Sequence, residues 1–306
     1  MSSAPAITAT TIEARCRVAV SDRARTSTNS NGSFADITGA TSGIGRRTAE
    51  EFVREGAKVV ATGRREELGR TLEASLGKDK CIFVKADATR EADVKAVFEA
   101  CLAKWGKLDC LFNNAGGQFP APAAAMSAKG FDVVVRNNLT GGFIVSREVF
   151  TQSMEKHGGA IVNMTADYRN GFPNMVHTGA ARAGMANLTM TLAYEWAVSG
   201  VRVNSVAPGW IASSGLDQYP AEMREHIRAL PKRVPLGRLG TESEVSAAIV
   251  FLLSPAAAFI SGACLRVDGA APNAKRIWPQ VGTGGTTPEF NGFHLARRPK
   301  VLDDPA

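Results

Sequence analysis

A glycine-rich segment near the start of the regular sequence pattern has the residue types that hold phosphate groups. Residues 38–45 read Thr-Gly-Ala-Thr-Ser-Gly-Ile-Gly, and a helical pattern follows directly. Glycine permits a sharp turn and a close approach of the backbone to a pyrophosphate. The N–H groups of the first helical turn and the helix dipole attract the anion. The segment therefore predicts a dinucleotide site formed by Gly39, Thr41, Ser42, Gly43, Ile44 and Gly45.

An arginine pair after the expected second strand bears on which dinucleotide binds. An acidic residue at this point would bind a free ribose 2′-hydroxyl, but the chain has Gly63, Arg64 and Arg65. A guanidinium suits a 2′-phosphate, which favours NADP(H) over NAD(H), with Arg64 as the expected contact. The alternative interpretation is that both arginines are solvated at the start of a helix.

Other cofactor-binding candidates follow the ends of later expected strands. Asp87 is placed to accept a hydrogen bond from an adenine amino group, and Ser213 to bind a nicotinamide carboxamide. Because ligands of such folds bind beyond the carboxyl ends of the strands, we expect these residues to gather there. The remaining candidates are Asn114, Gly116, Pro208, Gly209 and Ile211.

Short apolar runs alternate with helical periods from residue 34 onward. Strands are expected at 34–38, 58–62, 81–85, 108–113, 160–164, 201–206 and 264–267, and helices at 46–55, 66–76, 91–105, 131–156, 176–198 and 243–253. This alternation predicts an α/β fold with a doubly wound parallel sheet covered on both faces. We expect a single domain at 34–269 with a polar lid at 212–233. An irregular or disordered arm at 1–33 precedes it, and a C-terminal tail at 270–306 follows.

The first expected strand contains an unusual residue. Asp36 falls in the middle of a strand that should be central and buried, where an unpaired charge is costly. Residues 17–20, Arg-Val-Ala-Val, make a better opening strand but lie too far before the glycine-rich turn. Residues 21–35 would then interrupt the usual junction between strand and loop.

Composition excludes several classes of protein. The net charge is +7, but no basic stripe is interleaved with aromatic residues, so nucleic acid is not an expected partner. No run of about 18 apolar residues occurs, so no membrane span is expected. The five cysteines include no C-x-x-C pair and the four histidines have no metal-ligand spacing. This fits a cytoplasmic protein without a metal, with an organelle address in the N-terminal arm as the alternative.

Four motifs together resemble the short-chain dehydrogenase/reductase family. They are T-G-x-x-x-G-I-G at 38–45, N-N-A-G at 113–116, V-R-V-N-S-V-A-P-G at 201–209 and V-D-G at 267–269. The resemblance implies a Rossmann-type doubly wound fold and a nicotinamide cofactor. It also implies a homotetramer or homodimer built on the two long helices.

The expected catalytic centre departs from the usual pattern of this family. Members usually have a Ser followed by Tyr-x-x-x-Lys, and an Asn on the preceding long helix. By resemblance, Thr178 stands at the Tyr position and Arg182 at the Lys position. Thr165 or Ala166 stands near the Ser position, and Asn138 matches the helper Asn. Threonine is not a competent acid at neutral pH and Arg182 stays charged, so ordinary alcohol or ketone chemistry lacks its usual proton donor.

A subfamily with different chemistry matches this departure. Residues 113–119, 177–184 and 193–197 resemble peroxisomal trans-2-enoyl-CoA reductase and bacterial relatives associated with the breakdown of citronellol-type terpenoids. The resemblance implies that NADPH adds hydride to the β-carbon of an α,β-unsaturated acyl-CoA. Charge then builds on the thioester oxygen, so the site needs an oxyanion donor.

Candidate donors are Tyr168, Thr178 and the backbone at 116–118. Tyr168 lies in the loop where the related 2,4-dienoyl-CoA reductases place a tyrosine; the alternative interpretation is a tyrosine of a surface loop. Two other functions stay open. One is a dehydrogenase that uses Tyr168 on a terpenoid alcohol or aldehyde, or on a 3-hydroxyacyl thioester. The other is an NADP-binding protein with weak or no catalysis.

Overall fold

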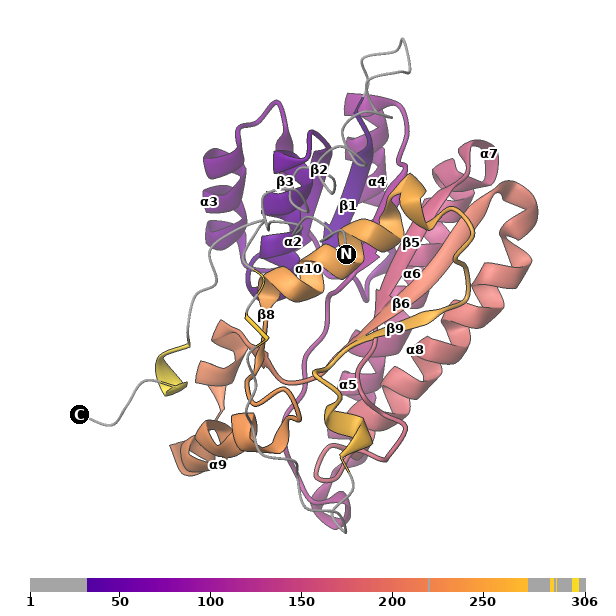
Figure 1. The fold of residues 1–306 in the computed structure, drawn as a ribbon. Helices are drawn as coiled ribbons and strands as arrows, with labels where there is room; N and C mark the ends of the chain where they lie inside the picture. The colour runs from indigo at the N-terminus through magenta and orange to yellow at the C-terminus, as the bar shows by residue number, and fades with distance from the viewer. Residues whose placement is uncertain (1–31, 220, 275–286, 289, 291–298, 303–306) are drawn as a thin grey trace, which may run out of the picture.

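The computed structural model describes residues 32–219, 221–274, 287–288, 290 and 299–302. These residues form one α/β domain around a seven-stranded parallel sheet, ordered β3-β2-β1-β4-β5-β6-β9 (Figure 1). From β1 the strand order proceeds through β2 and β3 to one edge, and from β4 it proceeds to the other edge. The carboxyl ends of β1 and β4 are therefore the switch point at which such folds bind ligands. The predicted doubly wound fold is confirmed.

The strands of the sheet follow the predicted apolar runs closely. The five inner strands β2, β1, β4, β5 and β6 are mostly buried, as expected for a parallel sheet with both faces covered, whereas the edge strands β3 and β9 are more exposed. Their bounds are β1 (Phe34–Thr38), β2 (Lys58–Gly63), β3 (Cys81–Lys85), β4 (Cys110–Asn113), β5 (Gly159–Met164), β6 (Val201–Pro208) and β9 (Cys264–Val267).

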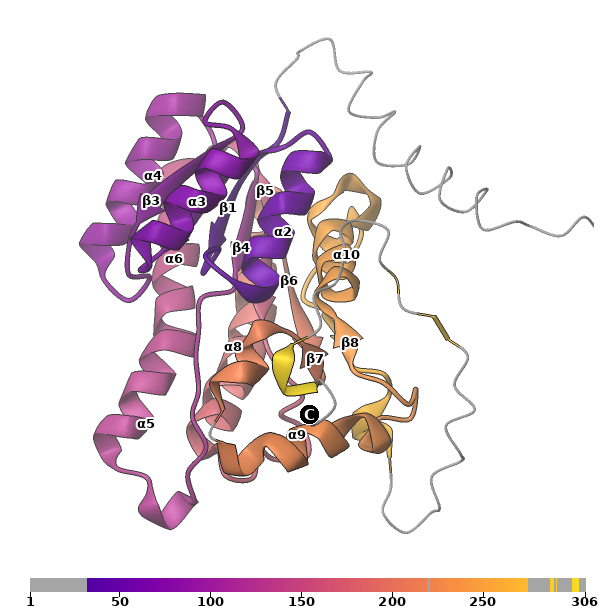
Figure 2. The ribbon, with the colours of Figure 1, turned by 90° about the vertical axis from the view of Figure 1, so that its left-hand side faces the viewer.

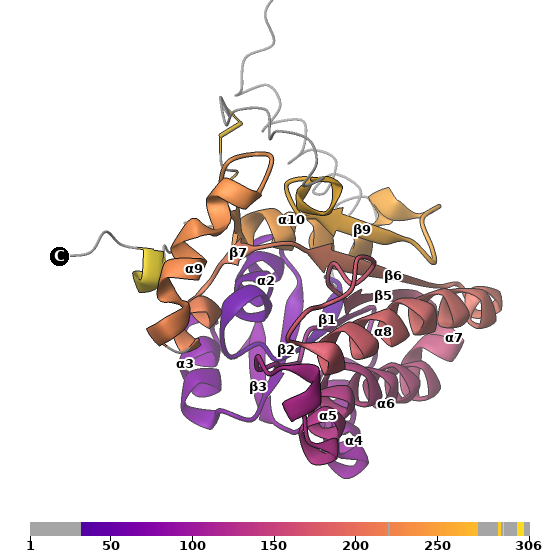
Figure 3. The ribbon, with the colours of Figure 1, turned by 90° about the horizontal axis from the view of Figure 1, so that it is seen from below.

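Helices cover both faces of this sheet, as Figure 3 shows from below. One face packs against α2 (Gly43–Arg54), α3 (Glu66–Leu76) and α10 (Glu242–Leu253), and the other against α4 (Glu91–Trp105), α6 (Gly141–Val149) and α8 (Val176–Glu195). Within the described part of the chain, no helix has both the length and the apolar character needed to cross a bilayer.

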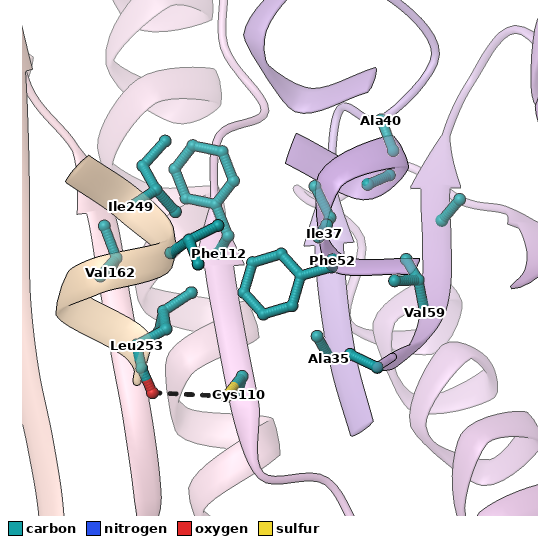
Figure 4. Packing of buried hydrophobic residues seen from close by; sticks show 14 of the residues in the cluster. Ala35, Ile37, Ala40, Phe52, Val59, Cys110, Phe112, Val162, Ile249 and Leu253 are labelled. Carbon is teal, nitrogen blue, oxygen red and sulfur yellow. Dashed lines mark hydrogen bonds between the residues drawn. The ribbon is translucent and has the colours of Figure 1, made fainter. Parts of the chain in front are cut away.

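The core on the first face ties the cofactor end of the domain to α10. Figure 4 shows Phe52 of α2 beside Phe112 of β4, with Ile249 and Leu253 of α10 on the far side. Phe112 and Ile249 are fully buried. Burial of such side chains stabilises the fold by about 1.5–3 kcal/mol each, which holds α2 and its preceding glycine turn at a fixed place on the sheet.

The helix predicted at 131–156 is a composite. It consists of α5 (Ala128–Val135), a π-helical turn η2 (Arg136–Thr140), α6, a second π-helical turn η3 (Phe150–Met154) and the short α7 (Glu155–His157). In η2 the Asn138 Nδ2 atom donates to the Val134 carbonyl at 2.9 Å. A widened turn of this kind re-aims one side chain without ending the helix, and such turns are frequent at functional sites.

The opening strand is β1, with Asp36 buried at its centre and 1% exposed. Its carboxylate accepts a hydrogen bond from Thr62 Oγ1 on β2 at 2.9 Å. Burial raises the pKa of Asp36 to about 7, although the hydrogen bond from Thr62 opposes this shift. The alternative opening strand at 17–20 and most of the predicted arm lie outside the described residues.

The predicted lid, 212–233, and part of the C-terminal tail form a small second core. The lid begins at β7 (Ile211–Ala212), which pairs with β8 (Gly240–Thr241), and contains α9 (Arg224–Ala229) (Figure 2). Leu216, Ile227, Leu230 and Leu239 pack with Val301 of the tail. The described residues 299–302 therefore lie against the lid of their own chain.

Candidate active site

The glycine-rich turn between β1 and α2 adopts the conformation that its glycines predict. Gly39 has φ 67° and Gly43 has φ 58°, a region that favours glycine. A Cβ atom at Gly45 would lie 2.5 Å from the Gly39 carbonyl oxygen and would also strike the Asn114 side chain. Asn114 Nδ2 in turn donates to the Thr38 carbonyl at 3.0 Å, so the turn is fastened to the end of β4.

The start of α2 is suited to an anion. Ser42 is the N-cap residue, yet its side chain caps no first-turn amide within the described structure, and the first turn contains no acidic residue. The N-terminal N–H groups and the helix dipole therefore favour a phosphate at this point. Together with the glycines that permit close approach, this fits a dinucleotide pyrophosphate over Gly43, Ile44 and Gly45.

Arg65 contacts the same turn, although Arg64 was the arginine expected there. Its Nη2 atom donates to Thr41 Oγ1 at 2.8 Å and also to Ser42 Oγ. Arg64, the residue expected to reach a 2′-phosphate, is exposed. The sequence feature that could have indicated this contact is Gly63. A Cβ atom there would lie 2.8 Å from the Thr41 side chain, so glycine lets the end of β2 pack against the turn.

Asp87, the predicted adenine contact, follows β3 and is held ionised. Its Oδ1 atom accepts hydrogen bonds from the Thr89 backbone at 2.9 Å and the Thr89 hydroxyl at 2.8 Å. Burial opposes ionisation, but these bonds and the charges of Arg64 and Arg90 lower the pKa of Asp87 below its usual value. An ionised carboxylate accepts hydrogen bonds, as an adenine amino group requires.

Asn138, Arg182 and Gly116 meet beyond the end of β4. Asn138 Nδ2 donates to the Gly117 carbonyl at 2.7 Å, and Asn138 Oδ1 accepts from the Gly117 amide at 3.3 Å. A Cβ atom at Gly116 would strike Asn138 and lie 2.9 Å from Arg182 Nη2. Arg182 Nη1 also donates to the Met164 carbonyl at 2.6 Å. The structure thus brings together three of the predicted site residues from β4, η2 and α8.

Arg182 is half-buried and stays charged. Loss of water contact lowers the pKa of its guanidinium to about 10, which still leaves it protonated at neutral pH. The group can donate hydrogen bonds to ribose hydroxyls or to a substrate oxygen, but it cannot act as a base. This agrees with the expectation drawn from the residue type.

The two predicted threonines have buried hydroxyl groups with partners inside the protein. Thr165 Oγ1 donates to the Val206 carbonyl at 2.8 Å. Thr178 Oγ1 lies 3.1 Å from His177 Nδ1, and burial lowers the pKa of this histidine, which favours a neutral ring. Both threonines are at most 2% exposed. Their hydroxyls are therefore engaged in the protein interior in this conformation.

Tyr168 and the residues after β6 complete the predicted set. Tyr168 is half-buried in the loop that follows β5. Gly209 directly follows β6, and a Cβ atom there would lie 2.8 Å from the Asp268 Cα atom, so glycine is needed at this close approach. Pro208 ends β6, Ile211 begins β7, and Ser213 opens the lid.

The lid reaches the active-site loop through a contact that links distant parts of the sequence. Gln118 Nε2 donates to the Tyr219 hydroxyl at 3.0 Å. Gln118 directly follows Gly117, which Asn138 holds, so this hydrogen bond joins the lid to the same loop. No pattern in the sequence singled out Tyr219.

Comparison with known proteins decides the family. The family model described as enoyl-(acyl carrier protein) reductase matches residues 39–270. The chain belongs to the short-chain dehydrogenase/reductase family. This member is therefore an oxidoreductase with a nicotinamide cofactor, as the resemblance implied.

Relatives of this short-chain dehydrogenase/reductase include reductases of unsaturated thioesters. It is 38% identical to peroxisomal 2,4-dienoyl-CoA reductase of Rattus norvegicus over 244 residues, 78% of this chain and 82% of the relative. It is 36% identical to a probable 2,4-dienoyl-CoA reductase of Bacillus subtilis over 242 residues, 76% of this chain and 94% of the relative.

A solved structure of a terpenoid enzyme is also similar to this short-chain dehydrogenase/reductase. The citronellol catabolism dehydrogenase AtuB of Pseudomonas aeruginosa PAO1 superposes with a TM-score of 0.70 at 49% identity. The alignment covers 79% of this chain and 95% of AtuB. The two relationships predicted from the sequence, to unsaturated acyl-CoA reductases and to citronellol catabolism proteins, are both found.

Proposed function

We propose that this enzyme uses NADPH to reduce the C2–C3 double bond of a trans-2-enoyl-CoA thioester. The observation behind this proposal is the residue four places before Arg182. It is Thr178, whose buried hydroxyl contacts His177, so the usual phenol that protonates an alkoxide is absent from this position. Reduction of a conjugated double bond forms an enolate instead of an alkoxide, and the names of the relatives point to such thioesters.

The proposed preference for NADP(H) rests on two arginines. Arg65 contacts Thr41 and Ser42 of the phosphate turn, and Arg64 precedes it at the end of β2. Guanidinium groups bind phosphate with charge-assisted and often bidentate hydrogen bonds. A ribose 2′-phosphate beside the turn would accept hydrogen bonds from the Arg65 guanidinium, which here donates to the hydroxyl groups of Thr41 and Ser42.

Each part of the site has a defined task in this proposal. The bound nicotinamide supplies a hydride to the β-carbon of the thioester. Asn138 shapes the loop at Gly117, and Arg182 offers donors to the nicotinamide ribose from a half-buried position held by the Met164 carbonyl. Of the predicted donors, Tyr168 and the backbone at 116–118 remain for the thioester oxygen, because the buried Thr178 hydroxyl contacts His177. Such donors act best when they are held in place before the charge develops.

A second candidate function is oxidation or reduction of a terpenoid alcohol or aldehyde, or of a 3-hydroxyacyl thioester. The similarity to the citronellol catabolism dehydrogenase AtuB favours it. This chemistry needs a group that exchanges a proton with the substrate hydroxyl, and Tyr168 is the residue proposed for that role.

A substrate panel with purified enzyme tests these functions against each other. Oxidation of NADPH is followed with trans-2-decenoyl-CoA, 2,4-decadienoyl-CoA and citronellal, and reduction of NADP⁺ with citronellol and 3-hydroxydecanoyl-CoA. We expect turnover with trans-2-decenoyl-CoA and decanoyl-CoA as the product. Turnover only with the alcohols or the aldehyde would favour the second candidate, and binding of NADPH without any turnover would favour a cofactor-binding protein.

We also propose a homotetramer or homodimer in the cytoplasm. Exposed apolar side chains lie four residues apart along α8 and the turn after it, at Met190 (53% exposed), Tyr194 (86%) and Val198 (92%). Contiguous exposed apolar residues typically mark an interface. The four described cysteines are free thiols, which fits a reducing compartment.

A further inference from the structure

We propose that Tyr219 of the lid is a further catalytic residue, whose phenol donates a hydrogen bond to the thioester oxygen of the substrate. This inference rests on the proposed function. It assigns a donor to an oxygen that becomes negatively charged, and for which the two predicted threonines are poorly placed.

The position of Tyr219 follows from one long-range hydrogen bond. Gln118 Nε2 donates to the Tyr219 hydroxyl at 3.0 Å, across 101 residues of sequence. The preceding residue, Gly117, is held at both its amide and its carbonyl by Asn138. Because Asn138 and Arg182 also meet at Gly116, the lid phenol lies at the end of the loop that lines the reaction centre.

The direction of this hydrogen bond leaves the phenol proton available. The amide nitrogen of Gln118 is the donor, so the Tyr219 oxygen acts as acceptor. Among the described residues, Gln118 is the hydrogen-bond partner found for the Tyr219 hydroxyl. A phenol that accepts from an amide can donate its own proton to a second oxygen, and this makes it a suitable partner for a thioester carbonyl.

The lid segment that contains Tyr219 is anchored in the structure. Asp217 Oδ1 accepts a hydrogen bond from the Val301 amide at 2.9 Å, and Arg228 Nε donates to the Val301 carbonyl at 2.9 Å. Leu216 and Val301 are buried in the small core of the lid, and Tyr219 packs partly against it. The Val301 amide thus holds the side chain of Asp217, two residues before the phenol, and this reduces the cost of orienting the phenol on a substrate.

The chemistry balances without any additional reactant. As the β-carbon gains hydride, the electron pair of the C2–C3 bond moves toward the thioester oxygen, and water later provides a proton to the α-carbon. Tyr219 keeps its own proton throughout. Its hydrogen bond to the oxygen strengthens as negative charge develops, so it lowers the energy of the transition state more than that of the bound substrate.

The test compares Tyr219→Phe with the control variant Thr71→Val, which removes a hydroxyl group from an exposed site on α3. Loss of a preorganised oxyanion donor typically costs about 10²–10³ in kcat. We expect Tyr219→Phe to lower kcat with trans-2-decenoyl-CoA at least about tenfold, and Thr71→Val to retain the wild-type rate. The KM for NADPH should stay unchanged in both variants.

A binding measurement supplies a readout that is independent of turnover. Calorimetry of decanoyl-CoA with the enzyme free of nicotinamide should show weaker binding to Tyr219→Phe than to Thr71→Val, while the thermal unfolding of the two variants coincides. If the wild type reduces the enoyl thioester and both variants match it, the role of Tyr219 is wrong and the proposed function stands. If the wild type neither reduces nor binds thioesters, the proposed function fails and this inference fails with it.

Discussion

At the scale of single residues, the catalytic centre shows how a familiar arrangement can be kept while its acid is lost. Arg182 and Asn138 both lie against Gly116, so the group proposed to hold a ribose and its proposed helper are close together. Thr178 has a short side chain whose hydroxyl turns to His177. A site with fixed donors and without a phenol at this position favours enolate chemistry over alkoxide chemistry.

Arg65 offers a prediction at the same scale. Arg65→Ala should raise the KM for NADPH at least about tenfold, because a charge-assisted hydrogen bond is worth about 1.5–3 kcal/mol. The KM for NADH, which lacks the 2′-phosphate, should change little. Steady-state kinetics with both cofactors measure the two values.

Arg64→Ala is the matched control for this prediction. Arg64 and Arg65 are both exposed, but in the described structure only Arg65 donates side-chain hydrogen bonds to the phosphate turn. We expect a smaller effect from it than from Arg65→Ala. A larger effect would return the 2′-phosphate contact to Arg64, as first predicted from the sequence.

At the scale of elements, β1 combines a central position with a buried carboxyl group. Asp36 has a raised pKa of about 7, chiefly because burial penalises its charge. In the unfolded chain the carboxyl titrates near 3.9. Between these values the folded state binds the proton more tightly, so the free energy of unfolding falls as pH rises from about 4 to about 7 and then levels off.

Asp36→Asn should remove this dependence, since it keeps the shape and the acceptor for Thr62 but has no charge. We expect a higher free energy of unfolding than the wild type at pH 8, by about 1–3 kcal/mol, and a smaller difference at pH 4. Urea unfolding at several pH values measures both. Glu51, whose pKa burial also raises to about 7, contributes equally to both proteins and cancels. Parallel curves for the two proteins would show that Asp36 titrates normally.

At the scale of the whole molecule, the described tail residues 299–302 lie against the lid, and an apolar stripe on α8 is exposed. The described tail residues pack against the lid core, so this part of the tail lies on its own chain. Met190, Tyr194 and Val198 remain exposed on the opposite part of the domain. A second copy of the chain is the proposed cover for this stripe.

Charge placed on the stripe should reduce the size of the assembly. We expect the double variant Met190→Glu, Tyr194→Glu to shift the molar mass measured by light scattering toward that of a monomer, because a buried charge without a partner is costly at an interface. Leu68→Glu, on the exposed side of α3 with 37% exposure, is the matched control and should leave the mass unchanged. An unchanged mass in the double variant would place the interface elsewhere or make the protein a monomer.

The sequence alone was sufficient for the strands, most helices and the glycine turn. These features depend on local periodicity and on backbone conformations that glycine permits. The role of residues such as Gly39 and Gly45 can therefore be predicted from the sequence. Asp36 could also be recognised as costly from its place in the pattern. The π-helical turn at Asn138 was missed because an added residue within a turn leaves the apolar period nearly unchanged.

Only the tertiary structure decided which side chains meet. Arg65 rather than Arg64 contacts the phosphate turn because Gly63 packs against Thr41. Tyr219 reaches Gln118 because the lid folds onto its own core with Val301. Such contacts join residues far apart in the chain, and their geometry follows from the packing of several elements together, which no local pattern in the amino-acid sequence encodes.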